Sequence, residues 1–111
     1  MYQYKAIITA IYDGDTVTVD ISLGLGVWVR GEKLRLYGIN APEVRGDSRI
    51  RGIASRDWLR NIALGKEVTL ITIKDKKGKY GRYLAKISLL DDARTLNDMI
   101  VGAGHAIYKE Y

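Results

Sequence analysis

Acidic and basic side chains recur in three short segments of this chain, each next to an apolar run. The segments are Asp13-Gly14-Asp15, Lys33 to Glu43 (which contains Arg35), and Lys79-Tyr80-Gly81-Arg82. An arginine fork matches phosphate oxygens and keeps its proton near neutral pH. Carboxylates bind hard divalent cations or accept a proton from water. If the fold brings these segments together, they supply the groups that metal-assisted phosphodiester cleavage needs.

The two acidic turns differ in how much they indicate. In the first, the central glycine can adopt positive φ, so Asp13 and Asp15 could direct a carboxylate at a cation. Asp-Gly is also common in ordinary turns, so this segment alone indicates only a turn. In the second, Pro42 fixes its own φ and holds Ala41 extended, which sets the direction of the Ala41 carbonyl and of Glu43. The alternative for Glu43 is an exposed loop carboxylate.

Each arginine alone would be interpreted as a surface residue. Arg35 lies in an alternating run in which Leu34 and Leu36 point the other way, shortly before the proline turn. Arg82 follows a basic turn that contains glycine. Combined with the acids, the two arginines predict a phosphate-binding site.

The elements that must position these groups are predicted from the spacing of the apolar residues. Strands are predicted over residues 4–12, 16–23, 27–30, 33–39, 67–73 and 83–90. A helix is predicted over about 48–64, and Thr95 with Asp98 resembles a capping box that opens a short helix over about 95–104. A closed barrel with helices outside fits this order, because closure leaves no sheet edge. We therefore expect one domain over residues 1–111, mainly β with helices, with a five-stranded OB-fold barrel.

Two apolar features are predicted to pack inward. The long helix has an apolar face with a spacing of three or four residues, formed by Ile50, Ile53, Ala54, Trp58 and Ile62. Trp28 lies in a strand-like stretch, which favours packing against the barrel. A nucleic-acid platform is the alternative for Trp28.

The composition narrows the classes of function. The 111 residues have a formal net charge of +5, and every Lys and Arg except Lys5 lies at Arg30 or beyond it. Such a field suits DNA or RNA, although charge of this size also serves solubility. The absence of cysteine excludes disulfides, thiolate metal sites and a cysteine nucleophile. We see no secretory signal and no apolar run long enough to span a membrane, which favours a cytoplasmic location without a membrane partner.

Together the motifs resemble those of the staphylococcal (micrococcal, thermonuclease-like) nuclease family, in the family's order. The resemblance rests on Asp-Gly-Asp-Thr-Val at 13–17, Leu-Arg-Leu at 34–36, Asn-Ala-Pro-Glu at 40–43 and Lys-Tyr-Gly-Arg at 79–82. It covers nearly the whole chain and fits a short form without the family's last long helix. It implies an OB-fold and calcium-dependent, sugar-non-specific endonucleolytic cleavage of DNA and RNA to 3′-phosphate ends.

The resemblance also implies roles for individual residues. Arg35 and Arg82 would bind the phosphate, and Glu43 would act on the attacking water. Lys79 and Tyr80 would lie near the bound nucleotide. The implied calcium ligands are one carboxylate, one amide oxygen, one backbone carbonyl and one carboxylate acting through water, which are Asp15, Asn40, Ala41 and Glu43. The side chains that would support these ligands from outside the ligand set are Asp13 and Thr16.

Asn40 departs from the family, which usually has a metal-binding aspartate at this position. An amide keeps an oxygen but removes a negative charge, so we expect weak calcium binding, on the order of 10⁻⁴–10⁻³ M. Loss of catalysis is the alternative, which would leave a barrel that only binds single-stranded nucleic acid. A third possibility, a protein-interaction module, predicts degenerate motifs that this sequence does not have. A protein partner or a homodimer is compatible with the chain but not indicated by it.

Overall fold

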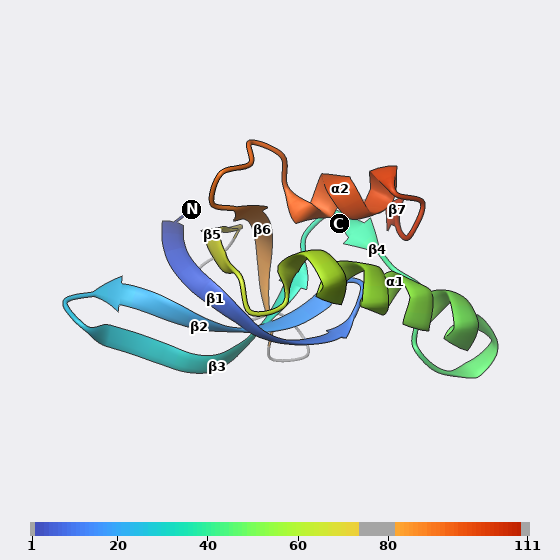
Figure 1. The fold of residues 1–111 in the computed structure, drawn as a ribbon, viewed down its shortest axis with the longest axis horizontal. Helices are drawn as coiled ribbons and strands as arrows, with labels where there is room; N and C mark the ends of the chain where they lie inside the picture. Colours follow the sequence, from blue (N-terminus) through green and yellow to red (C-terminus); the bar gives the residue numbers. More distant parts are fainter. Residues whose placement is uncertain (1, 74–81, 110–111) are drawn as a thin grey trace.

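The fold is built around five strands that close into a barrel. The computed structural model describes residues 2–73 and 82–109. The barrel strands are β1 (Tyr2–Asp13), β2 (Thr16–Gly24), β3 (Val27–Leu36), β5 (Glu67–Thr72) and β6 (Tyr83–Leu89). Their spatial order is β1-β2-β3-β6-β5, and every neighbouring pair is antiparallel except β3 with β6 (Figure 1). The prediction of a mainly β chain with a five-stranded OB-fold barrel is confirmed.

Alternation along the strands places the core. In β2, Val17, Val19 and Ile21 are buried, as period two predicts for a strand with one solvated face. The same pattern buries Leu34 and Leu36 of β3, so the residues between them in sequence must face outward. Arg35 is the residue between Leu34 and Leu36, and its direction is therefore fixed by the packing of its two neighbours.

Two helices lie outside the barrel (Figure 1). A short 3₁₀ turn, η1 (Gly46–Ser48), leads into α1 (Arg49–Ala63), and α2 (Leu96–Gly102) follows β6. The Thr95 hydroxyl oxygen accepts a hydrogen bond from the Asp98 N–H at 3.0 Å, which satisfies one of the amides left over at the start of α2. Within the described ranges, neither helix has the length and apolarity needed to cross a membrane.

The prediction of which face of α1 packs against the barrel was wrong. The residues of α1 that are buried are Gly52, Ser55, Leu59 and Ala63. Ile50 is 83% exposed, whereas Trp58 and Ile62 are only partly buried against the core. Three of the four buried residues are small, so the helix approaches the barrel more closely than a face of large apolar side chains would permit.

A second, two-stranded sheet was not predicted. It joins β4 (Ile39–Asn40) to β7 (Ile107–Tyr108), with Asn40 opposite Ile107. The Lys109 N–H donates to the Gly38 carbonyl at 2.7 Å and continues the pairing. Strands of two residues are too short to show a readable period. This pairing ties the segment around Asn40 to a part of the chain more than sixty residues later in the sequence.

The hairpin of β2 and β3 extends away from the barrel (Figure 1). Gly24 pairs with Val27, and the two residues between them, Leu25 and Gly26, have φ of 56° and 76°. Two positive φ angles are the mark of a type I′ turn, which matches the strand twist. The expectation that Trp28 packs against the barrel was wrong, because its side chain lies on this extension and is 38% exposed.

Candidate active site

The turn between β1 and β2 fixes the position of Asp15. The Asp15 N–H donates to the Asp13 carboxylate at 3.0 Å, and the Asp15 carbonyl accepts from the Leu36 N–H at 2.8 Å. A Cβ on Gly14 would overlap the hydroxyl oxygen of Ser55, so glycine is required there by the close approach of α1. The turn is therefore held by β3 on one side and by α1 on the other.

Asp15 and Arg35 form a buried ion pair. Arg35 Nη1 lies 2.9 Å from Asp15 Oδ2, and the side chains are only 13% and 9% exposed. The same Asp15 oxygen accepts a hydrogen bond from the Ala41 N–H at 2.9 Å. Arg35 Nη2 donates to the Ile39 carbonyl at 3.2 Å and to Asn40 Oδ1 at 3.3 Å. The guanidinium thus connects the first turn to the segment that carries the proline motif.

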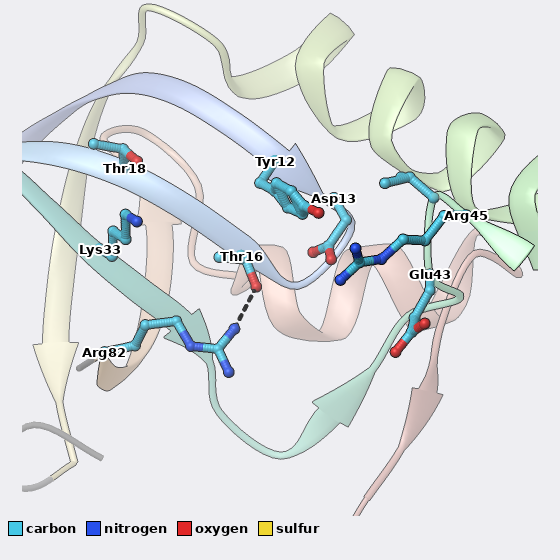
Figure 2. Close-up of a pocket in the computed structure, with 9 residues that line it drawn as sticks. Tyr12, Asp13, Thr16, Thr18, Lys33, Glu43, Arg45 and Arg82 are labelled. Atoms are coloured by element: carbon cyan, nitrogen blue, oxygen red, sulfur yellow. Dashed lines mark hydrogen bonds between the residues drawn. The ribbon is translucent and has the colours of Figure 1, made fainter. Parts of the chain in front are cut away.

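Arg82 reaches the same carboxylate through one hydroxyl. Arg82 Nη1 donates to the Thr16 hydroxyl oxygen at 3.0 Å, drawn as the dashed line in Figure 2. The Thr16 hydroxyl donates in turn to Asp15 Oδ1 at 3.1 Å. Asp15 therefore orients both arginines, Arg35 directly and Arg82 through Thr16.

A cleft of about 600 Å³ opens beside this network. The cleft is lined by Tyr12, Asp13, Thr16, Thr18, Lys33, Glu43, Val44, Arg45 and Arg82. Glu43 and Arg82 lie on opposite sides of it in the view of Figure 2. Glu43 is exposed, and no hydrogen bond or ion pair to its carboxylate is found among residues 2–73 and 82–109. The carboxylate is therefore accessible to water and to a ligand in the cleft.

The backbone of Glu43 is fixed although its side chain is exposed. A Cβ on Gly52 would overlap the Glu43 carbonyl oxygen, so the first turns of α1 pack directly on this peptide. The Ser48 hydroxyl donates to the same carbonyl at 2.9 Å. These contacts hold the residue after Pro42 at a set distance from the helix, whatever fills the cleft.

The two acids of the first turn have opposite pKa shifts. Burial, reinforced by the neighbouring Asp15 carboxylate, raises the pKa of Asp13 to about 6. Burial also acts to raise the pKa of Asp15. Hydrogen bonding with Asp13 and the Ala41 N–H, together with the Arg35 guanidinium, outweighs burial and lowers the pKa of Asp15. Asp15 is thus the member of the pair that loses its proton first as the pH rises, and Asp13 follows near pH 6.

The groups predicted to bind calcium are only partly gathered. Among the described residues, no three His, Cys, Asp or Glu side chains converge as a metal cluster would require. Asn40 and Ala41 line a different hollow of about 490 Å³, with Pro42 and His105, while Glu43 lines the main cleft. The predicted direct donors are the Asp15 carboxylate, the Asn40 amide oxygen and the Ala41 carbonyl, and Asp15 is joined to Ala41 by a hydrogen bond from the Ala41 N–H. Oxygen donors of this kind fit calcium in type, at a low total charge.

Some cleft residues were not predicted, and some predicted ones cannot be placed. Arg45 was missed; in Figure 2 its side chain points into the cleft near Asp13 and Glu43. Its position two residues after Glu43 was the available signal, since alternate residues of an extended segment share a face. Lys33 was also missed as a cleft residue. The predicted substrate-binding residues Lys79 and Tyr80 lie outside the described residues.

A comparison with known protein families gives a match, and the matched residues include most of this site. Residues 33–111 match the family described as Staphylococcal nuclease homologue. The chain belongs to this family. A search among curated proteins found no match. The matched part contains Arg35, Glu43 and Arg82 but begins after the first acidic turn. Asp15 is joined to the matched part by its ion pair with Arg35 and its hydrogen bond from Ala41.

We predict that Gly52→Ala lowers the free energy of unfolding by about 1–3 kcal/mol, because the added methyl group must displace the Glu43 peptide. Alanine is the better helix former, so helix propensity alone predicts the opposite sign. Urea denaturation followed by circular dichroism measures the difference. Gly102→Ala is the matched control, since a Cβ there meets no atom within 4 Å. Equal behaviour of the two variants would contradict the close packing of α1 on Glu43.

We predict that Asp13→Asn stabilises the calcium-free protein above pH 6 and has little effect below pH 4. The pKa of Asp13 rises from 3.8 to about 6 on folding, so the folded state binds the proton more tightly. The wild type therefore loses stability as the pH rises from about 4 to about 6. The asparagine variant lacks this loss, and its side-chain oxygen can still accept the Asp15 N–H. Thermal unfolding of the wild type and Asp13→Asn in chelator at several pH values tests this prediction. A difference in stability between the two proteins that does not change with pH would contradict it.

Proposed function

We propose that this chain is a calcium-dependent, sugar-non-specific endonuclease that hydrolyses DNA and RNA, preferably single-stranded, to 3′-phosphate ends. The observation that carries the proposal is the pair of arginines held by one buried carboxylate beside a cleft lined by Glu43. Membership of the staphylococcal nuclease homologue family supports a phosphodiester substrate.

Arg35 and Arg82 bind the phosphate in this proposal. Negative charge grows on the phosphoryl oxygens as water attacks phosphorus, and a fixed guanidinium offsets this charge without reorganising. Arginine also keeps its own proton, so it acts by charge and hydrogen bonding and not as an acid. Fixing the two arginines through Asp15 and Thr16 meets the requirement that such donors be in place before the reaction.

Glu43 accepts the proton of the attacking water. Its exposed carboxylate lines the cleft together with Arg82, so a water between the two could be activated and aimed at a bound phosphate. The hydroxide oxygen forms a bond to phosphorus while the bond from phosphorus to the 5′ oxygen breaks. The 5′ oxygen leaves and takes a proton from solvent, the phosphate stays on the 3′ oxygen, and Glu43 later releases its proton to solvent. One water is consumed for each bond cleaved.

The residues that would hold calcium are Asp15 through its carboxylate, Asn40 through its amide oxygen, Ala41 through its carbonyl, and Glu43 through a water. Bound calcium supplies a Lewis acid that offsets charge on the phosphate. Asp15 is suited to this because its lowered pKa keeps it ionised. Oδ2 of Asp15 accepts from Arg35 and Ala41, and Oδ1 accepts from Thr16, so the ion would use the remaining lone pair of Oδ1.

The second candidate function is nucleic-acid binding without catalysis. It is favoured by Asn40, whose amide oxygen accepts from Arg35 and carries no charge. A site with one ionised carboxylate among its direct ligands attracts calcium less than a site with two. The two functions share the same cleft and the same arginines and differ in whether an ion is held beside them.

Cleavage of denatured DNA tests the first candidate. We expect fragments with 3′-phosphate ends when calcium is present, and no cleavage in excess chelator. Glu43→Gln should lower the rate by about 10²–10⁴, because it removes the proton acceptor and keeps the size of the side chain. Glu67→Gln makes the same change on the exposed start of β5 and should cleave at the wild-type rate. Chelator-insensitive cleavage, or equal rates for all three proteins, would rule out the proposed mechanism.

Calcium affinity tests the role of Asn40. Asn40→Asp adds a second charged ligand, so we expect calcium to bind about tenfold more tightly in isothermal titration calorimetry. Asn61→Asp adds the same charge at an exposed position of α1 and serves as the control. If the two variants bind calcium alike, Asn40 is not a ligand and the alternative without catalysis gains support.

A further inference from the structure

The outward face of the β2–β3 hairpin forms a continuous polar strip that begins inside the cleft. The cross-strand pairs along it are Thr16 with Arg35, Thr18 with Lys33, and Ser22 with Trp28. The alternate residues Val17, Val19 and Ile21 are buried on the other face. Thr18 and Lys33 also line the cleft, so the strip shares residues with the cleft.

Small side chains form the floor of the strip and longer ones its flank. β2 contributes Thr18 and Ser22, while β3 contributes Lys33 and Trp28 on the same face. Between these pairs Arg30 forms an ion pair with Asp20 at 2.9 Å. Alternate residues of a strand are about 6.6 Å apart, so the strip extends the cleft by several side chains. The pairing shifts register between Val19 and Ile21, and such a bulge bends the strip along its length.

Trp28 presents an aromatic surface at the far end of the strip. It is 38% exposed, and the Arg30 guanidinium carbon lies 5.0 Å from the ring centroid. Asp20 holds Arg30 in this place and offsets its charge, so the ring and not the guanidinium is the distinctive feature here. A large ring kept on a polar face, away from the core, is suited to stacking against a planar ligand.

We propose that this strip binds the part of a single-stranded nucleic acid that runs away from the cleaved bond, with a phosphate at Lys33 and an unpaired base stacked on Trp28. The inference rests on the proposed function, since it requires nucleic acid in the cleft. Every base has a π-face, so such stacking adds affinity without selecting a sequence. Bases in a duplex are already stacked on their neighbours and cannot use Trp28. The strip therefore accounts for a preference for single strands.

Binding to strands of different length tests the strip. Fluorescence anisotropy is measured in chelator, so that no strand is cut, with labelled single strands of about 4 and about 12 nucleotides and with a 12-mer duplex. We expect the wild type to bind the longer single strand more tightly. Trp28→Ala should weaken binding of the longer single strand about tenfold and leave the affinities for the shorter strand and the duplex unchanged. Trp28→Phe should keep most of the extra affinity for the longer strand. Lys33→Ala removes one phosphate contact, so the slope of the logarithm of the binding constant against the logarithm of the salt concentration should become shallower by about 0.7.

Leu23→Ala is the matched control on the same hairpin. Leu23 is 52% exposed and alternates with Ser22, so it lies on the opposite face. Wild-type binding by this variant supports the strip. An equal loss for Leu23→Ala and Trp28→Ala would overturn it, because the loss would then not depend on the face that carries Trp28. Wild-type affinity that does not grow with length also overturns it.

Cleavage assays separate this inference from the proposed function. If the wild type shows Trp28-dependent binding but cuts no strand in calcium, the nuclease proposal fails and the strip stands. If it cuts denatured DNA while Trp28→Ala binds long strands like the wild type, the strip is overturned and the nuclease proposal stands. Equal thermal unfolding of Trp28→Ala and the wild type confirms that any loss is not a loss of folding.

Discussion

The buried carboxylate of Asp15 is the interaction on which the candidate site depends. It accepts from Arg35 on β3, from Thr16 at the start of β2 and from the Ala41 amide in the proline segment. Breaking a buried pair of this kind leaves an unpaired charge, which costs about 3–5 kcal/mol. The three contacts are therefore mutually dependent, and the positions of both arginines follow from one acidic group.

The second constraint is the close packing of α1 against the first acidic turn and against the Glu43 peptide. This packing depends on glycines, which have no Cβ. Gly14 leaves room for Ser55, and Gly52 leaves room for the Glu43 peptide. The buried Ser55 hydroxyl donates to the His105 carbonyl at 2.8 Å, so α1 also holds the segment after α2. A cleft with an exposed catalytic candidate can be rigid in this way, because its backbone is packed while its side chain stays in water.

The barrel could be predicted from the sequence, but the buried face of α1 and the position of Trp28 could not. Period two in β2 and β3 specified both the strands and the outward direction of Arg35. The phase of α1 could not be found in this way, because Gly52 and Ser55 are buried for their size and not for their hydrophobicity. Trp28 was misplaced because the length of the hairpin beyond the barrel has no signature. The acids and arginines of the candidate site were proposed from residue type and spacing, but the hydrogen bond from Arg82 to Thr16 depends on tertiary geometry alone.

The small β4–β7 sheet has a consequence for how the molecule is made. Asn40 pairs with Ile107, and the Gly38 carbonyl accepts from the Lys109 amide. A polypeptide emerging from the ribosome presents the acidic turn and Arg35 long before residue 107 has been added. Until then the proline segment lacks the strand that holds it in place. This last support of the candidate site is thus added after Asp15, Arg35 and Arg82 have been synthesised, and the growing chain stays without it beside messenger RNA.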